Sequence, residues 1–233
     1  RQIAASLDTW GRMHRGGSYS EQCFIMANEC LNAAAMLRER GWTVEAPSRE
    51  RLNMSGGPAN AITAVHELVG DEILGALIFC HGDWFSREQQ DQKDWRGQYA
   101  SRVMTPMFII KERLFQKRLV GHRLLESVVM VASTRGFIGG VNTGPYAAAC
   151  AAQIALMQGY AREWPGVRFN CVCPGLTAGR MGQQVIATGG ANPDAAPQDP
   201  AAVAAAIVGL VEGDETGQVL RVVDGQVTRA RWE

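Results

Sequence analysis

The chain lacks several features that would mark a common class of protein. Its 23 acidic and 23 basic side chains cancel, which argues against a surface for nucleic acid or another polyanion. The longest apolar run, near residues 72–80, is far too short to span a membrane. The N-terminus has no signal-peptide core, so we expect no membrane partner and a cytoplasmic location.

Metal-binding patterns are also missing. The six cysteines form no CxxC pair, and no histidine follows Cys171 and Cys173 at the spacing of metal ligands. The four histidines are dispersed along the chain. We therefore expect no metal site.

What the chain does have is an alternation of apolar strand-like runs with helix-like stretches, which predicts one α/β domain with a parallel, doubly wound, Rossmann-like sheet. Helices are expected over 31–40, 59–68, 95–116, 145–163 and 200–211, with Gly41 and Pro200 at helix ends. Strands are expected over 22–27, 42–45, 73–80, 127–132, 167–172 and 218–223. The domain then covers residues 21–233, and residues 1–20 form an arm onto a partner or a flexible tail.

The most informative segment is VVMVASTRGFIGGVNTGPYAAAC, residues 128–150. A β-branched run ends at Ser133, a Gly-rich loop follows, and Tyr146 opens an Ala-rich helix. This segment resembles the active site of short-chain dehydrogenases/reductases. The resemblance implies that Ser133 and Tyr146 are the catalytic pair that polarises a carbonyl, and that a lysine should follow Tyr146 by one helical turn. Cys150 occupies that position.

The substitution at position 150 has a direct chemical consequence. A phenol with a pKa near 10 shuttles protons poorly at neutral pH unless a nearby cation favours the phenolate. Residues four apart share a helix face, so Cys150 should lie beside Tyr146 and leave it protonated. Arg135 is the only cation nearby in the sequence, and whether it reaches the phenol depends on the loop over 136–144.

Three further segments resemble the same family, in the same order along the chain. ALIFCHGDW resembles the strand and turn that normally reads Asn-Ala-Gly, of which only Gly82 remains. NCVCPGLTAGRM resembles the turn that borders the nicotinamide, and it implies a cofactor role for Pro174, Gly175 and Thr177. TGQVLRVVDG, residues 216–225, resembles the final strand.

The cofactor end departs from the family pattern. After a strand at 22–27, the turn over 28–33 contains no glycine to admit a pyrophosphate, and Glu29 adds negative charge there. The same residues also suit an ordinary helix start with Asn28 as its N-cap. The asparagine implied on the central helix is missing, and Arg102 or a neighbour stands in its place. The nicotinamide contacts at Gly82, Pro174, Gly175 and Thr177 are then residual, and this chain is expected to bind no NAD(P).

Three functions remain open. The first is a catalytically silent subunit that assembles with itself or with an active family paralogue carrying NAD(P), and supports the fold or substrate pocket of that partner. The resemblance implies pairing through the long helices, where Met104, Met107, Phe108 and Phe115 form an apolar stripe. The second is a non-redox enzyme that uses Ser133 and Tyr146. The third is a weak NAD(P)-dependent oxidoreductase in which Arg135 replaces the lysine.

Overall fold

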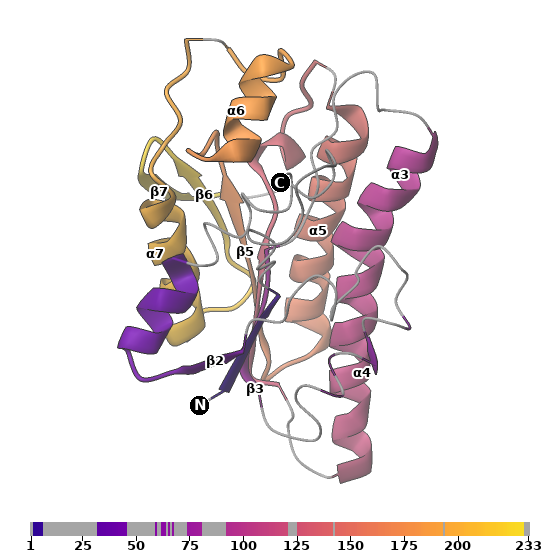
Figure 1. Ribbon diagram of the computed structural model, residues 1–233. Helices are drawn as coiled ribbons and strands as arrows, with labels where there is room; N and C mark the ends of the chain where they lie inside the picture. The colour runs from indigo at the N-terminus through magenta and orange to yellow at the C-terminus, as the bar shows by residue number, and fades with distance from the viewer. Residues whose placement is uncertain are drawn as a thin grey trace.

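The computed structural model describes residues 2–6, 32–45, 59, 62–63, 65, 67, 74–80, 92–120, 125–141, 143–192 and 194–230. These residues build a seven-stranded sheet in the order β2-β1-β3-β4-β5-β6-β7. Every neighbouring pair is parallel except β6 and β7. Helices cover both faces of the sheet (Figure 1). The predicted doubly wound α/β fold is confirmed.

The described strands are β1 (Gln2–Ser6), β2 (Thr43–Glu45), β3 (Leu74–Phe79), β4 (Ser127–Val131), β5 (Arg168–Pro174), β6 (Val219–Val223) and β7 (Gln226–Arg229). Strands β3 and β4 are buried along their whole length, as expected for parallel strands covered on both faces. Five of the six predicted strands coincide with β2 to β6 within two residues at each end. The sixth prediction, over 22–27, lies outside the described residues.

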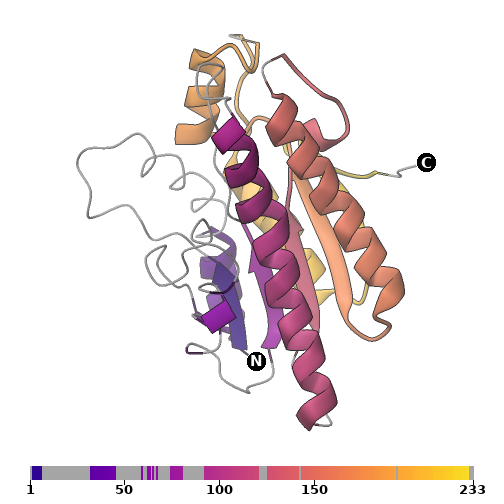
Figure 2. The same cartoon turned by 90° about the vertical axis from the view of Figure 1, so that its right-hand side faces the viewer.

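The helices form a layer on each face. One layer holds α3 (Gln92–Tyr99), the π-helical turn η4 (Ala100–Met104), α4 (Thr105–Val120) and α5 (Gly144–Glu163). Figure 2 shows α3, η4 and α4 as one continuous rod beside α5. The other layer holds a helix over 32–39 and α7 (Pro200–Glu212), and α6 (Arg180–Ala187) lies beyond the end of β5 (Figure 1). One hydrophobic core lies under each layer.

The first strand corrects the predicted domain boundary. Gln2–Ser6 pairs with β2 on one side and β3 on the other, so it belongs to the centre of the sheet and not to an arm over 1–20. Its sequence, QIAAS, holds one large apolar side chain, and such a segment carries little strand signal before its partners are known. The link from β1 to the helix over 32–39 spans residues 7–31, which lie outside the described residues. The predicted glycine-free turn at 28–33 lies mostly among these residues. Because β1 is Gln2–Ser6, this turn does not directly follow the first strand of the sheet.

Two helix ends follow their predicted chemistry. Gly41 adopts the left-handed region at φ 83° and closes the helix over 32–39. The Asp199 carboxylate accepts from the Ala201 amide at 2.8 Å, and Pro200 occupies the first turn of α7.

The C-terminal hairpin was not predicted. Asp224 and Gly225 form a tight turn with φ values of 51° and 74°, which is typical of a two-residue hairpin. Strand β7 is exposed along its length, so its sequence lacks the alternation that marks a strand.

No helix in the described part of the chain is long and apolar enough to cross a lipid bilayer. Nor do the described residues bring together three His, Cys, Asp or Glu side chains that would hold a metal ion.

Gly136 allows the loop after β4 to pack on α5. A Cβ at this position would lie 2.9 Å from Ile154 Cδ1 and 3.0 Å from the backbone at Cys150 and Ala151. We expect Gly136→Ala to lower the free energy of unfolding by about 1–3 kcal/mol, because the helix backbone cannot yield to the added methyl group. Urea unfolding measures the change. The matched control is Gly139→Ala, where a Cβ meets nothing within 4 Å. Equal stability of the two variants would contradict this packing.

Candidate functional site

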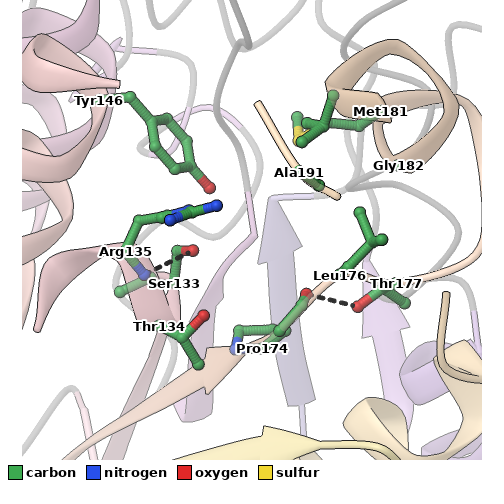
Figure 3. Close-up of a pocket in the computed structure, with 13 residues that line it drawn as sticks. Ser133, Thr134, Arg135, Tyr146, Pro174, Leu176, Thr177, Met181, Gly182 and Ala191 are labelled. Carbon is green, nitrogen blue, oxygen red and sulfur yellow. Dashed lines mark hydrogen bonds between the residues drawn. The ribbon is translucent and has the colours of Figure 1, made fainter. Parts of the chain in front are cut away.

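A cavity of about 160 Å³ opens where β4 and β5 end (Figure 3). Five of the six predicted site residues line it, namely Ser133, Tyr146, Pro174, Gly175 and Thr177. The sixth, Gly82, lies outside the described residues. The parallel sheet explains the convergence, because the carboxyl ends of its strands meet at one edge and the loops that follow them share that space.

Ser133 is placed by the end of β4. Its backbone is extended, and its hydroxyl caps the short 3₁₀ turn Thr134–Gly136 by accepting from the Arg135 amide at 3.2 Å. The same hydroxyl lies close enough to the phenol of Tyr146 to lower its pKa. The predicted Ser133 and Tyr146 pair is therefore in contact.

Tyr146 lies in the first turn of α5, which begins with Gly144 and Pro145. Its neighbours hold it in the protonated form: burial and the adjacent Cys150 thiol raise its pKa well above the usual range for tyrosine. Arg102 and the Ser133 hydroxyl act in the opposite direction and do not offset burial. At neutral pH the phenol is a hydrogen-bond donor and a very weak acid.

Cys150 lies where the helical spacing predicts, one turn after Tyr146, and the two side chains influence each other's ionisation. It is fully buried, and burial raises its pKa from 9.0 to about 11, although Arg102 and Tyr146 lower it. The side chain at this position is thus a neutral thiol at physiological pH. Behind it on β5, Cys171 and Cys173 are also buried free thiols.

Arg102 supplies the positive charge at this site. It lies in the π-helical turn η4 with none of its surface exposed, and its guanidinium carbon is 4.5 Å from the centroid of the Tyr146 ring. Its Nε donates to Gln98 Oε1 at 2.8 Å. The sequence marked Arg102 only as the replacement of an asparagine and held no signal that it would contact Tyr146, since the π-turn shifts the helix register.

Arg135 has a different role from the one proposed for it. Its Nη2 donates to the Gly190 carbonyl at 2.7 Å, which ties the turn after β4 to the loop after α6. Arg102, and not Arg135, is the cation that lowers the pKa of Tyr146. The prediction that Arg135 replaces the missing lysine is not supported.

Thr177 is held by a buried glutamine that the sequence did not single out. Its hydroxyl donates to the Gly175 carbonyl at 3.1 Å and accepts from Gln198 Nε2 at 3.2 Å. Gln198 also donates to the Val222 carbonyl at 2.9 Å and accepts from the Gly225 amide at 3.1 Å. It lies in a polar, Ala-rich segment without periodicity, so no pattern marked it. The Thr177 hydroxyl therefore already donates and accepts within the protein.

Helix α6 closes one side of the cavity. Met181 and Val185 line the cavity from this helix (Figure 3). Gly182 permits its close approach, because a Cβ there would lie 2.2 Å from the Thr177 carbonyl oxygen. The helix gives the pocket an apolar wall.

Comparison with known proteins identifies the architecture. Residues 83–189 match the family model described as short chain dehydrogenase. This match covers just under half of the chain, whose fold is that of the short-chain dehydrogenases/reductases. No curated protein sequence matches it.

Solved structures of family members have the same fold. A short chain dehydrogenase/reductase family protein is 19% identical, with a TM-score of 0.70 and 96% of each chain covered. A small-chain dehydrogenase in complex with NADPH is 18% identical, with a TM-score of 0.69 and 96% of each chain covered. A glucose/ribitol dehydrogenase of the family from Brucella melitensis is 18% identical, with a TM-score of 0.67, and covers 97% of this chain and 96% of its own.

The buried thiol makes this protein sensitive to alkali. The unfolded Cys150 thiol ionises near 9.0 and the folded one near 11, so the folded state binds its proton more tightly and stability falls as pH rises through this window. As the pH rises, we expect the Cys150→Ala variant to lose about 2–3 kcal/mol less free energy of unfolding than the unmodified protein. Urea unfolding of the unmodified protein and of the variant, at about pH 8 and about pH 11, measures this difference. Identical losses in the two chains would show that Cys150 does not resist ionisation.

Proposed function

We propose that this chain is a catalytically silent short-chain dehydrogenase/reductase subunit, which binds a carbonyl or oxyanion group and assembles with an active NAD(P)-dependent relative. The observation that carries the proposal is the buried, neutral Cys150 thiol one helical turn after Tyr146, at the position where the family resemblance implies a lysine.

Reduction of a carbonyl by hydride requires a proton at the carbonyl oxygen, and a phenol serves this step only when its pKa lies near the working pH. The pKa of Tyr146 is raised, so proton transfer from it at neutral pH is unfavourable. A neutral phenol and the Ser133 hydroxyl still donate hydrogen bonds to an oxygen placed between them. Binding is therefore supported better than turnover.

The described part of the site fits a working nicotinamide poorly. Pro174, Gly175 and Thr177 stand where the resemblance implies contacts to that ring, but the Thr177 hydroxyl already donates to Gly175 and accepts from Gln198, so it can only accept one further hydrogen bond. Position 150 offers no charged donor to a cofactor hydroxyl. We therefore propose that this chain binds no NAD(P) and that the cofactor belongs to the active partner.

Titration with NADPH and with NADH tests this directly. We expect neither quenching of the six tryptophans nor binding heat up to about 1 mM. The NADPH-bound family member named above serves as the positive control. Binding on the order of micromolar would overturn the proposal in favour of a weak NAD(P)-dependent oxidoreductase.

A second candidate is a non-redox enzyme that uses the same pair. The observation that favours it is the Arg102 guanidinium against the Tyr146 ring, a buried cation that stabilises developing negative charge on the phenol oxygen. For any turnover found without nicotinamide, Tyr146→Phe would abolish it and leave the fold intact. Turnover that persists in this variant would exclude Tyr146 from the reaction.

The assembly part of the proposal rests on the outer side of the α3–η4–α4 rod. Trp95, Met104 and Phe108 are 43%, 44% and 37% exposed there, whereas Met107 packs partly into the core. The Phe115 side chain of the predicted stripe lies outside the described set. Large apolar side chains exposed on one rod suit a protein interface. A cytoplasmic location remains a prediction.

We expect Phe108→Glu to dissociate the partner, because a carboxylate in the middle of an apolar interface loses its hydration. The measurement is co-purification from the native source, with light scattering and mass spectrometry to identify the partner. The matched control is Val227→Glu, which changes a valine on β7 that is 49% exposed. A chain that purifies only as a homo-oligomer, without an active dehydrogenase relative, would contradict the heteromeric proposal.

A further inference from the structure

We propose that Arg102 is the positioning residue for Tyr146, and that it provides from the neighbouring helix rod the positive charge that position 150 on α5 lacks. The inference deepens the proposed function, since it concerns how Tyr146 presents its phenol to a bound oxygen.

The first support is geometric. The Arg102 guanidinium carbon lies 4.5 Å from the centroid of the Tyr146 ring, which is well within the range of a cation–π contact. The guanidinium is fully buried, and such contacts strengthen when both groups are removed from water. The cation therefore lies against one face of the ring, while Ser133 and Cys150 act on the ionisation of the hydroxyl.

The second support is how the backbone delivers Arg102. The helix rod changes from α to π over Ala100–Met104 and returns to α at Thr105, whose amide donates to the Ala100 carbonyl. Short π-turns inside α-helices are often found at functional sites. Gln98, 1% exposed and one turn earlier, accepts from Arg102 Nε at 2.8 Å and fixes the plane of the guanidinium. The π-turn and the hydrogen bond with Gln98 together direct the Arg102 side chain toward Tyr146.

The third support is the electrostatic setting. The groups that act on the phenol are Cys150 from α5, Ser133 from the end of β4 and Arg102 from η4, and Cys171 and Cys173 face Cys150 from β5. Burial raises the pKa of Tyr146, Cys150 and Cys173, so these groups keep their protons at physiological pH. Among these described groups, Arg102 alone carries a positive charge, and it lowers the pKa of both Tyr146 and Cys150.

The test replaces Tyr146 with 3,5-difluorotyrosine. Fluorine lowers the intrinsic pKa of the phenol. This one residue then ionises within the pH range in which the protein stays folded. Fluorine NMR then follows its titration in the absence of any ligand. We expect Arg102→Gln to raise the midpoint by about one pH unit or more, which is a tenfold or greater change in the ionisation constant. Arg102→Lys should restore most of the shift, because it keeps the charge.

Arg113→Gln is the matched control, since Arg113 is 2% exposed and lies in the same rod. If Arg102→Gln does not fold, Arg102→Met keeps an apolar side chain of similar length and should raise the midpoint in the same way. An Arg102 variant that folds with the midpoint of the Arg113 control would overturn the proposal. Because the titration contains neither NAD(P)H nor substrate, tight NADPH binding in the earlier experiment would refute catalytic silence and leave this result standing.

Discussion

The chemistry of this site depends on a phenol enclosed between two helices. Tyr146 lies where α5 meets the π-turn of the neighbouring rod, with Cys150 beside it on its own helix and Arg102 across its face. Burial outweighs every other influence on its ionisation, so the neutral form dominates. Because the lysine implied by the family is a thiol here, the cation that lowers the pKa of Tyr146 comes from another helix and lies against the face of its ring.

This arrangement separates two properties that one lysine would combine. A lysine one turn after the tyrosine would bring both a positive charge and a flexible donor to the pocket. Arg102 brings charge, but it is fully buried and its Nε is bound to Gln98, and it is absent from the residues that line the cavity. It acts on a ligand only through Tyr146. The site therefore keeps a positive charge that acts on the phenol, while the side chain at position 150 supplies no charged donor.

The sequence predicted the parts of this structure that depend on local pattern. Continuous apolar runs marked β3 to β5, and the spacing of Ser133, Tyr146 and Cys150 predicted contacts that follow from a strand end and one helical turn. It missed β1, because QIAAS becomes a strand only by pairing with β2 and β3. With a first strand expected over 22–27, the glycine-free turn at 28–33 counted against a bound dinucleotide, but β1 ends at Ser6 and does not lead directly into that turn.

Contacts between distant segments were beyond the sequence for the same reason. The interaction of Gln198 with Thr177 joins residues 21 apart, and that of Arg135 with Gly190 joins residues 55 apart. Neither contact corresponds to a periodic pattern in the sequence. Arg102 was visible as an unusual residue, but its place against Tyr146 depends on a π-turn that no composition marks. Sequence pattern identified which residues are unusual, and only tertiary packing shows which of them meet.

The pocket itself argues against a relic that has merely lost its function. Gln198 satisfies Thr177 and two backbone groups at the ends of β6 and β7, Arg135 ties two loops across the opening, and Gly182 lets α6 approach. Each of these contacts holds the cavity in shape without a cofactor. A pocket of fixed shape needs no ordering when a ligand enters, which favours affinity. The physical logic is that of a binding site kept rigid by its own side chains, with a tyrosine that donates a hydrogen bond and retains its proton.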